Sequence, residues 1–317
     1  MTNKKKYENL KIIFMGTPEF AVPSLDILVK NGYDIVGVIT STDKYGGRGN
    51  KKLIESSVKK YALENKLRVL QPKNLKSPQF NEELQSLNAD LQVVVAFRML
   101  PAVVWDMPPL GTINLHSSLL PKYRGAAPIY WAVINGETET GVTTFFLKHE
   151  IDTGDILLSE KLNIGENETA GELHDRLMIL GAEVILRSME MIKSNDYELK
   201  PQDNSQLSKA PKIFHETCKI NFGNSIETVH NFIRGLSPFP TAWTSLDGLK
   251  LKIFKSKKVE EKHHFKPGKI ATDNKNYFRI ATQDGFVEIL ELQMQGRKRM
   301  EIKAFLNGYQ LERDYIG

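Results

Sequence analysis

The sequence predicts an α/β protein in which a doubly wound, mostly parallel sheet is followed by a small β-barrel domain. Three observations support this fold class. Strand-like and helix-like patterns alternate over residues 11–192, as they do in Rossmann-like sheets with helices on both faces. The polar segment 194–211, with two prolines, is typical of a linker. Short strand-like runs then dominate residues 212–317, which favours a barrel with one or two helices.

The first region shows both periodicities clearly. Short β-branched and apolar runs indicate strands, whereas apolar residues three to four apart, such as Leu173, Leu177 and Leu180, indicate a helix. Pro18 suits the first turn of a helix, and Gly32 suits the position just after its end. The expected strands are residues 11–15, 34–40, 68–70, 91–96, 111–115 and 143–147. The expected helices are residues 18–31, 57–65, 76–87, 126–134 and 169–193.

The second region is punctuated by turn signals. Asp247-Gly248 and Asp284-Gly285 are dipeptides that favour β-hairpins. An amphipathic segment over residues 226–236 predicts one helix. The expected strands are residues 250–255, 269–272, 278–282 and 286–293. Spacing alone therefore indicates a small antiparallel domain.

Composition narrows the class of protein. The 317 residues are 26% charged and 41% hydrophobic, which is ordinary for a globular chain. No apolar run approaches the ~18 residues of a membrane-spanning helix, and residues 1–10 are polar and lysine-rich, unlike a secretory signal. The single cysteine, Cys218, excludes an intramolecular disulfide and a cysteine-rich zinc site. We expect a cytoplasmic protein, with a monomer as the default state.

Positive charge is concentrated in the last third of the chain. Residues 1–208 carry 24 Lys and Arg against 26 Asp and Glu, a net charge of −2. Residues 209–317 carry 19 against 12, a net charge of +7. An excess confined to one region is the pattern expected for a polyanionic partner, although a solubilising surface would give the same count.

A carboxamide and an imidazole stand two residues apart at the end of one predicted strand. Asn114 and His116 share one side of an extended chain, because side chains i and i+2 point the same way. An amide N–H can stabilise an oxyanion, and an imidazole can carry a proton near neutral pH. Asp152 follows the next predicted strand, and we expect it at the same edge because sites form at the carboxyl ends of parallel strands. Asp155 is interpreted as a structural turn residue.

Two motifs carry a family resemblance. Residues 114–125 read Asn-Leu-His-Ser-Ser-Leu-Leu-Pro-Lys-Tyr-Arg-Gly, and residues 151–155 read Ile-Asp-Thr-Gly-Asp. Together they resemble the signature of the 10-formyltetrahydrofolate-dependent formyltransferase family. Residues 12–21, 46–53 and 124–129 are similar to the branch of that family that acts on methionyl-tRNA. The resemblance covers nearly the whole chain.

The resemblance implies a reaction and a role for each motif residue. A formyl group would pass from 10-formyltetrahydrofolate to the α-amino group of methionine on initiator tRNA, with no metal involved. Asn114 would stabilise the tetrahedral oxyanion, and His116 would transfer the proton while Asp152 holds and tunes it. The leaving group is N10 of tetrahydrofolate, which must be protonated as it departs. The implied folate-binding residues are Phe97, Met99, Leu100, Ser117, Ser118, Leu119, Leu120 and Pro121.

The resemblance also implies a division of labour between domains. Residues 1–193 would form the catalytic, folate-binding domain with the formyltransferase fold, 194–211 a linker, and 212–317 an oligonucleotide/oligosaccharide-binding-type barrel that binds tRNA. The basic loop over residues 42–53 would wedge against the acceptor end of the tRNA, with Arg48 in the key position. The candidate tRNA-binding residues are Lys44, Arg48, Lys51, Lys52, Lys255, Arg297 and Lys298.

Two positions depart from the family pattern. Residues 96–101 read Ala-Phe-Arg-Met-Leu-Pro, one residue shorter than the usual segment and without its glycine. The shape around the pterin ring is therefore expected to differ, with Arg98 as the unexplained side chain. Ser117 stands where glycine or proline is common, which is a small change.

Other functions stay open on the residues alone. The catalytic motifs also fit formyltransferases that act on glycinamide ribonucleotide or on amino-sugar nucleotides, and only the basic loop and the basic C-terminal region favour tRNA. An RNA-binding protein with a decayed catalytic domain and a folate-hydrolysing enzyme are further hypotheses. Dinucleotide binding is disfavoured, because Gly16-Thr17-Pro18-Glu19 lacks a second glycine and places an acidic residue where a pyrophosphate would lie.

Overall fold

The computed structural model describes residues 7, 9–46 and 52–316. The chain divides into two compact units that are each built from several segments. Unit 1 comprises residues 1–124, 141–162 and 175–209, and unit 2 comprises residues 125–140, 163–174 and 210–317. The domain limits expected from the sequence assign one continuous segment to each domain, and they stay a prediction.

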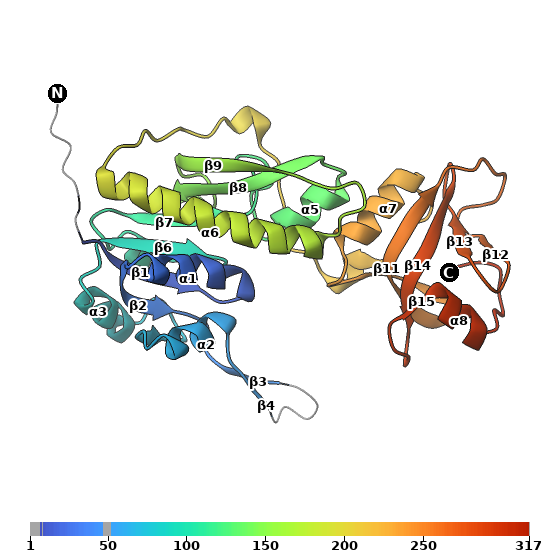
Figure 1. The fold of residues 1–317 in the computed structure, drawn as a ribbon, viewed down its shortest axis with the longest axis horizontal. Helices are drawn as coiled ribbons and strands as arrows, with labels where there is room; N and C mark the ends of the chain where they lie inside the picture. The colour runs from blue at the N-terminus through green and yellow to red at the C-terminus, as the bar shows by residue number, and fades with distance from the viewer. Residues whose placement is uncertain (1–6, 8, 47–51, 317) are drawn as a thin grey trace. The chain divides into compact units, whose positions relative to one another are not determined.

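Unit 1 is built on a seven-stranded sheet with the order β5-β2-β1-β6-β7-β8-β9 (Figure 1). The strands are β1 (Lys11–Gly16), β2 (Asp34–Ile39), β5 (Val69–Leu70), β6 (Leu91–Val95), β7 (Thr112–His116), β8 (Glu139–Phe146) and β9 (Ile156–Asn163). The first five are paired in parallel, whereas β8 runs antiparallel to β7. The predicted mostly parallel α/β sheet is confirmed, and its antiparallel part was not predicted.

The two faces of this sheet are covered by different helices. Phe80 and Leu84 of α3 pack in one buried cluster with Val94 of β6. Val94 pairs with Asn114 of β7, so the neighbouring Leu115 points to the opposite face. There Leu115 meets Gly181 of α6, and a Cβ added at Gly181 would lie 2.7 Å from the leucine side chain. The helices are α1 (Val22–Lys30), α2 (Ser57–Glu64), α3 (Pro78–Ser86), α4 (Ala102–Trp105) and α6 (Ala170–Ser194).

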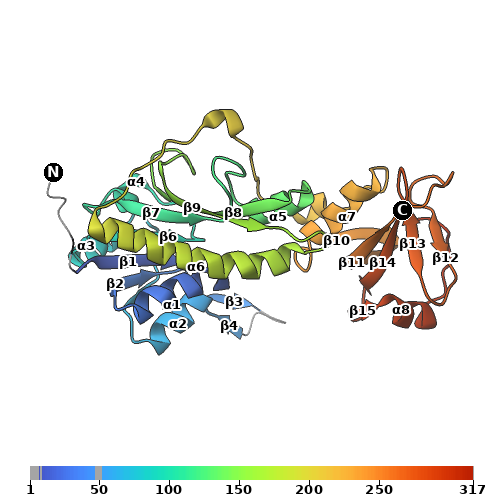
Figure 2. The same ribbon diagram turned by 45° about the horizontal axis from the view of Figure 1, so that its top comes forward.

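The predicted linker is not a free connector. After α6 the chain runs past β9 and β8 (Figure 2), and Lys200 exchanges two backbone hydrogen bonds, of 2.8 and 2.9 Å, with Ile156 at the start of β9. Further on, the carbonyl of Ser208 accepts a 3.0 Å hydrogen bond from the Arg124 amide. Residues 195–209 are therefore docked on unit 1 at both of these points.

Unit 2 contains a six-stranded antiparallel sheet with the order β10-β11-β14-β13-β12, and β15 also pairs with β14. Asp247 and Gly248, both at positive φ, form the two-residue turn between β10 and β11, as their sequence predicted. The strands are β10 (Ala242–Leu246), β11 (Leu249–Val259), β12 (Ile270–Thr272), β13 (Phe278–Ala281), β14 (Phe286–Met294) and β15 (Met300–Glu301). The predicted antiparallel C-terminal domain is confirmed.

Helices close the core of unit 2. The helix α7 (Ile226–Gly235) buries Val229 and Ile233 in the same cluster as the strand residues. The helix α8 (Ile302–Gly308) adds Phe305, whose ring meets Phe278 edge-on. The helix α5 (Pro128–Ile134) also belongs to this unit, where Ile134 lies against Gly235. No helix in the described ranges is long and apolar enough to cross a membrane.

Several short elements were not predicted. The basic segment over residues 42–53 contains a small hairpin, in which β3 (Lys44–Gly46) pairs antiparallel with β4 (Lys52–Ile54). The edge strand β9 and the strands β10 and β15 were also missed, as were α4 and α8. Their sequences are short, or they mix apolar and charged residues, so their periodicity is too weak to indicate a strand or a helix.

Candidate active site and nucleic-acid contacts

Asn114 and His116 lie on the face of the sheet that α6 does not cover. Ile113 and Leu115, the alternate residues of β7, are buried, and Leu115 faces Gly181 of α6. The strand periodicity therefore sends the Asn114 and His116 side chains to the other face. Within the described part of the chain the side-chain carboxamide of Asn114 forms no hydrogen bond. Its side-chain N–H groups are therefore available for a substrate oxygen.

The His116 ring has a defined tautomer. Its Nε2 atom lies 2.8 Å from the backbone carbonyl oxygen of Tyr123. A carbonyl can only accept, so Nε2 carries the proton and Nδ1 of the neutral ring is left with a lone pair. The nearest carboxylate oxygen to Nδ1 is Oδ2 of Asp152, at 3.9 Å. This distance is too long for a hydrogen bond, so Tyr123 orients the ring, and Asp152 acts on it through its charge.

Asp152 reaches the histidine by a different route from the predicted one. The prediction placed it at the carboxyl end of a parallel strand, but β8 is antiparallel to β7 and His116 lies opposite Thr143, inside β8. The carboxyl end of β8 is therefore at the far end of β7. The segment between β8 and β9 instead folds back over the sheet and brings the Asp152 carboxylate to the His116 ring.

The geometry of this segment depends on two special backbone positions. Asp152 has a φ of 55°, in the left-handed region that few non-glycine residues adopt. At Gly154 an added Cβ would lie 1.5 Å from the Phe146 carbonyl oxygen, so no other residue fits. Asp155 is paired with Lys148 at 2.8 Å, which agrees with its interpretation as a structural residue.

The loop after β7 is braced from inside. The hydroxyl of Thr143 donates to the Ser118 carbonyl at 2.7 Å and accepts from the Leu120 amide at 3.2 Å. The Ser118 hydroxyl donates to the Lys122 carbonyl at 2.6 Å. Ser118, Leu120 and Pro121 are buried, whereas Ser117 and Leu119 are half-buried. Of the loop residues predicted to bind folate, Ser118 thus has its hydroxyl engaged by the protein.

The apolar residues predicted to flank the pterin ring differ in how far they are buried. Phe97 and Leu100 pack against the buried cluster under α3, whereas Met99 is 75% exposed. Met99 and Leu100 line a hollow of about 670 Å³ together with Arg98. The Arg98 guanidinium donates to the carbonyls of Pro72 and Lys73 and lies 5.7 Å from the Phe97 ring. The Arg98 side chain is therefore docked on the neighbouring loop.

The predicted tRNA-binding residues are exposed wherever the structure describes them. Lys44 and Lys52 lie on the β3–β4 hairpin, whereas Arg48 and Lys51 fall outside the described residues. The hairpin also exposes large side chains to solvent: Tyr45 is 71% exposed and Ile54 is 52% exposed. In unit 2, Lys255, Arg297 and Lys298 are exposed, and Arg297 donates to the Gly308 carbonyl.

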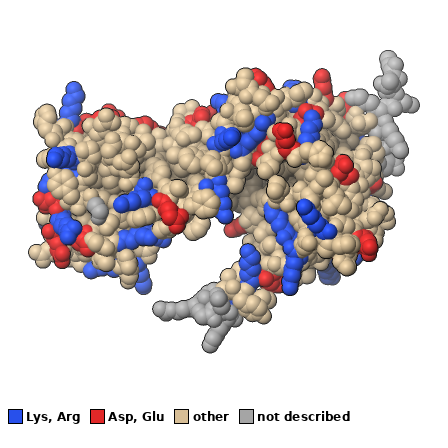
Figure 3. Space-filling view, turned by 180° about the vertical axis from the view of Figure 1, so that it is seen from behind, with Lys and Arg blue, Asp and Glu red and all other residues tan. Residues whose placement is uncertain are grey.

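Several basic side chains of unit 2 form ion pairs with neighbouring carboxylates. Basic side chains are interspersed with acidic ones on the face seen in Figure 3. The ion pairs Lys257–Glu288, Lys258–Glu227, Lys269–Asp314, Arg279–Glu288 and Arg299–Glu291 have N–O distances between 2.5 and 2.9 Å. These five basic side chains are therefore held by carboxylates and are less ready to meet phosphates than their unpaired neighbours.

A basic–aromatic cluster around Trp243 was missed by the sequence analysis. The ammonium of Lys250 lies 4.6 Å from the Trp243 ring centroid and that of Lys219 lies 5.9 Å from it. The His215 ring stacks on the indole with a centroid distance of 5.4 Å. Flat rings beside cations are the groups that contact unpaired nucleotides. No sequence signal could have found this cluster, because its members are brought together by β10, β11 and the segment before α7.

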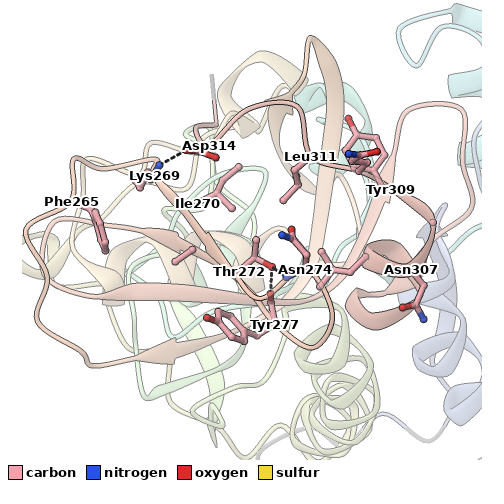
Figure 4. Close-up of a pocket in the computed structure, with 14 residues that line it drawn as sticks. Phe265, Lys269, Ile270, Thr272, Asn274, Tyr277, Asn307, Tyr309, Leu311 and Asp314 are labelled. Atoms are coloured by element: carbon pink, nitrogen blue, oxygen red, sulfur yellow. Dashed lines mark hydrogen bonds and ion pairs between the residues drawn. The ribbon is translucent and has the colours of Figure 1, made fainter.

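Unit 2 also contains a large open hollow of about 970 Å³, lined by residues between 265 and 314 (Figure 4). Lys269 and Asp314 are paired across one side of it, and the Thr272 hydroxyl donates to the Tyr277 carbonyl. None of the predicted site residues lines it. Among the residues that the structure describes, no group of three or more His, Cys, Asp and Glu side chains could hold a metal ion.

Known proteins resemble this chain in both sequence and fold. The model of the family described as formyl transferase matches residues 10–189, and that of the formyl transferase C-terminal domain matches residues 212–310. Two relatives named methionyl-tRNA formyltransferase, from Bacteroides fragilis and Flavobacterium johnsoniae, are 50% and 52% identical to this chain. These alignments cover 96% and 95% of this chain, and 97% and 96% of the relatives. A solved N-formyltransferase from Helicobacter canadensis, in complex with folinic acid and dTDP-3-aminofucose, is 25% identical with a TM-score of 0.69, covering 92% of this chain and 100% of that one.

Proposed function

The chain belongs to the formyl transferase family, and on that premise we propose that it transfers a formyl group from 10-formyltetrahydrofolate to the α-amino group of methionyl initiator tRNA. The observation that carries the proposal is the half-identity, over nearly the full length of both chains, with relatives named methionyl-tRNA formyltransferase. The product, N-formylmethionyl-tRNA, serves translation initiation. The cytoplasmic location and the monomeric state expected from the sequence stay predictions.

The site geometry supports a direct transfer with His116 as the proton carrier. The attacking amine loses a proton as its nitrogen bonds to the formyl carbon, and the Nδ1 lone pair of His116 is the free base that can accept it. The charged ring then has Nε2–H on the Tyr123 carbonyl and Nδ1–H beside the Asp152 carboxylate. When the bond from the formyl carbon to N10 breaks, the proton taken from the amine can pass from His116 to N10.

Asn114 supplies the complementary group. Its side chain shares a face of β7 with His116, so an amide N–H can donate to the formyl oxygen while the base acts on the amine. The oxygen gains negative charge only as the tetrahedral intermediate forms, so this hydrogen bond strengthens in the transition state. The apolar residues Met99 and Leu100 and the loop 117–121 are the groups proposed to hold the folate.

The acceptor is assigned by features outside the catalytic site. A hairpin with exposed lysines and an exposed tyrosine suits contacts with phosphates and unpaired bases. The Trp243 cluster in unit 2 offers a second surface of the same chemistry. An enzyme whose acceptor is a small amine has no need of either.

Acceptor competition tests the proposal. The protein is given formyl-labelled donor with equimolar methionyl initiator tRNA, an amino-sugar nucleotide and glycinamide ribonucleotide. We expect label on the methionine of the tRNA. Label only on a small amine would keep the chemistry and reject the tRNA acceptor, and label only in free formate would support a hydrolase.

A further inference from the structure

The segment that follows α6 makes specific contacts with the two parts of the site. Between residues 201 and 209 only Gln202 and Ser208 are half-buried, and the residues around them are exposed. The Gln202 side-chain nitrogen donates to the backbone carbonyls of Asp152 and Gly154, at 2.9 and 2.8 Å. Its side-chain oxygen accepts two hydrogen bonds from the Arg124 guanidinium, at 3.0 and 2.6 Å. All four bonding positions of the amide are thus occupied.

Ser208 makes the matching contacts on the histidine side. Its hydroxyl accepts from the Tyr123 amide at 2.8 Å, and its carbonyl accepts from the Arg124 amide at 3.0 Å. The carbonyl of Tyr123 is the group that fixes the His116 ring. One hydrogen bond therefore separates Ser208 from the residue that orients the base.

Both residues that the segment holds have an unfavourable backbone conformation. Asp152 has a φ of 55° and Tyr123 has a φ of 59°. Such non-glycine positions are strained and persist only where surrounding contacts over-determine them. Gln202 and Ser208 supply such contacts, one to each residue.

We propose that Gln202 and Ser208 form a positioning strap, in which Gln202 holds the Asp152 backbone and Ser208 holds the Tyr123 backbone so that the carboxylate and the imidazole keep their relative geometry. This inference rests on the formyl transfer proposed above. Gln202 and Ser208 are positioning residues, because they act on the reacting groups through Asp152 and Tyr123. The segment expected to be a linker thus contributes two positioning residues to the site.

The chain offers a matched pair of substitutions for the test. Gln202→Glu keeps the acceptor for Arg124 but removes both donors and sets a carboxylate against two carbonyl oxygens. Gln206→Glu makes the same change four residues away, where the side chain is exposed and donates a hydrogen bond to Asp203 at 3.4 Å. Ser208→Ala removes the acceptor for Tyr123, and Ser208→Thr restores a hydroxyl.

We expect Gln202→Glu and Ser208→Ala to lower kcat by roughly 10- to 100-fold, the size of effect that a small misplacement of reacting groups produces. The KM for methionyl-tRNA and the melting temperature should change little, Gln206→Glu should match the wild type, and Ser208→Thr should recover most of the rate. Amide hydrogen exchange measured by mass spectrometry should rise over residues 150–155 in Gln202→Glu and not in Gln206→Glu.

The outcomes separate this inference from the proposed function. The strap is overturned if Gln202→Glu keeps the wild-type kcat, even if the wild type formylates tRNA. It is also overturned if the fall in kcat is no larger than the fall in the amount of folded protein. Unchanged exchange over residues 150–155 overturns it regardless of activity. If the wild type formylates no tRNA but exchange responds as expected, the strap stands and the acceptor assignment is rejected.

Discussion

Replacing Asp152 with asparagine is the sharpest perturbation of the proposed mechanism. The side chains have the same shape, and asparagine tolerates the left-handed backbone that Asp152 adopts at a φ of 55°. The Gln202 hydrogen bonds are to backbone carbonyls, so they can persist in Asp152→Asn. The substitution therefore removes the charge facing His116 Nδ1 and leaves the segment in place.

The structure gives the size of the effect. Two unit charges 3.9 Å apart attract by about 4 kcal/mol at an effective dielectric constant of about 20. Both side chains are nearly buried, at 7% and 12% exposed, so solvent screens the pair only weakly. A transition state with half to all of the positive charge on the ring loses about 2–4 kcal/mol, which lowers kcat by roughly 30- to 1000-fold.

The assay is single-turnover formylation of methionyl initiator tRNA at saturating donor. Asp155→Asn is the control, since its carboxylate is in the same segment but pairs with Lys148 at 2.8 Å, and it should keep a wild-type rate. A rate for Asp152→Asn within about threefold of the wild type, or an effect confined to KM, would show that the carboxylate does not act on the charged ring.

Three further predictions follow from other parts of the molecule. Gly154→Ala should destabilise unit 1 by about 1–3 kcal/mol and lower kcat, because the added Cβ would overlap the Phe146 carbonyl. Thermal melting measures the stability and steady-state turnover measures kcat. An unchanged melting temperature would contradict the steric argument. Lys219→Ala combined with Lys250→Ala should weaken tRNA binding and reduce the slope of log K against log salt concentration by about one to two. The control Lys257→Ala, whose lysine is ion-paired, should leave this slope unchanged. If filter binding gives the double variant the same slope as the wild type, the Trp243 cluster is not part of the interface. Burial, with the nearby Arg234 and Lys258 cations, lowers the pKa of His230 from 6.5 to about 4, so the unfolded chain binds a proton that the folded chain rejects. The stabilisation is complete above about pH 6.5 and is lost as the pH falls, by about 2 kcal/mol between pH 7.5 and pH 5. Urea unfolding should show this loss of stability in the wild type and a smaller loss in His230→Gln. Equal losses in the two proteins would contradict the assignment to His230.

The sequence predicted the regular parts of the fold because their periodicity is strong. The parallel strands β1, β2 and β6 are continuous apolar runs, and α6 repeats its leucines on one face. The direction of β8 could not be predicted, because hydrophobic pattern records burial and not strand polarity. The edge strand β9 mostly alternates half-buried and exposed residues, with Leu157 as its buried residue, and its hydrophobic signal is correspondingly weak.

The site was predicted in part. The spacing of Asn114 and His116 places both on one face of a strand, and this follows from strand geometry alone. Asp152 was identified by motif resemblance, and the argument from parallel strand ends that supported it was wrong. Tyr123, Gln202 and Ser208 were missed as positioning groups, because their hydrogen bonds join residues 7, 50 and 85 positions apart.

The central claim is that His116 carries the proton in formyl transfer to methionyl initiator tRNA. The most direct measurement is a single-turnover time course of N-formylmethionine, identified by the mass of the methionine released from the tRNA, with the wild type and with His116→Ala at equal folded concentration. We expect the wild type to form N-formylmethionine and His116→Ala to form it at least ~100-fold more slowly, with tRNA binding unchanged. Equal formylation by both proteins, or unmodified methionine with formate released, would contradict it.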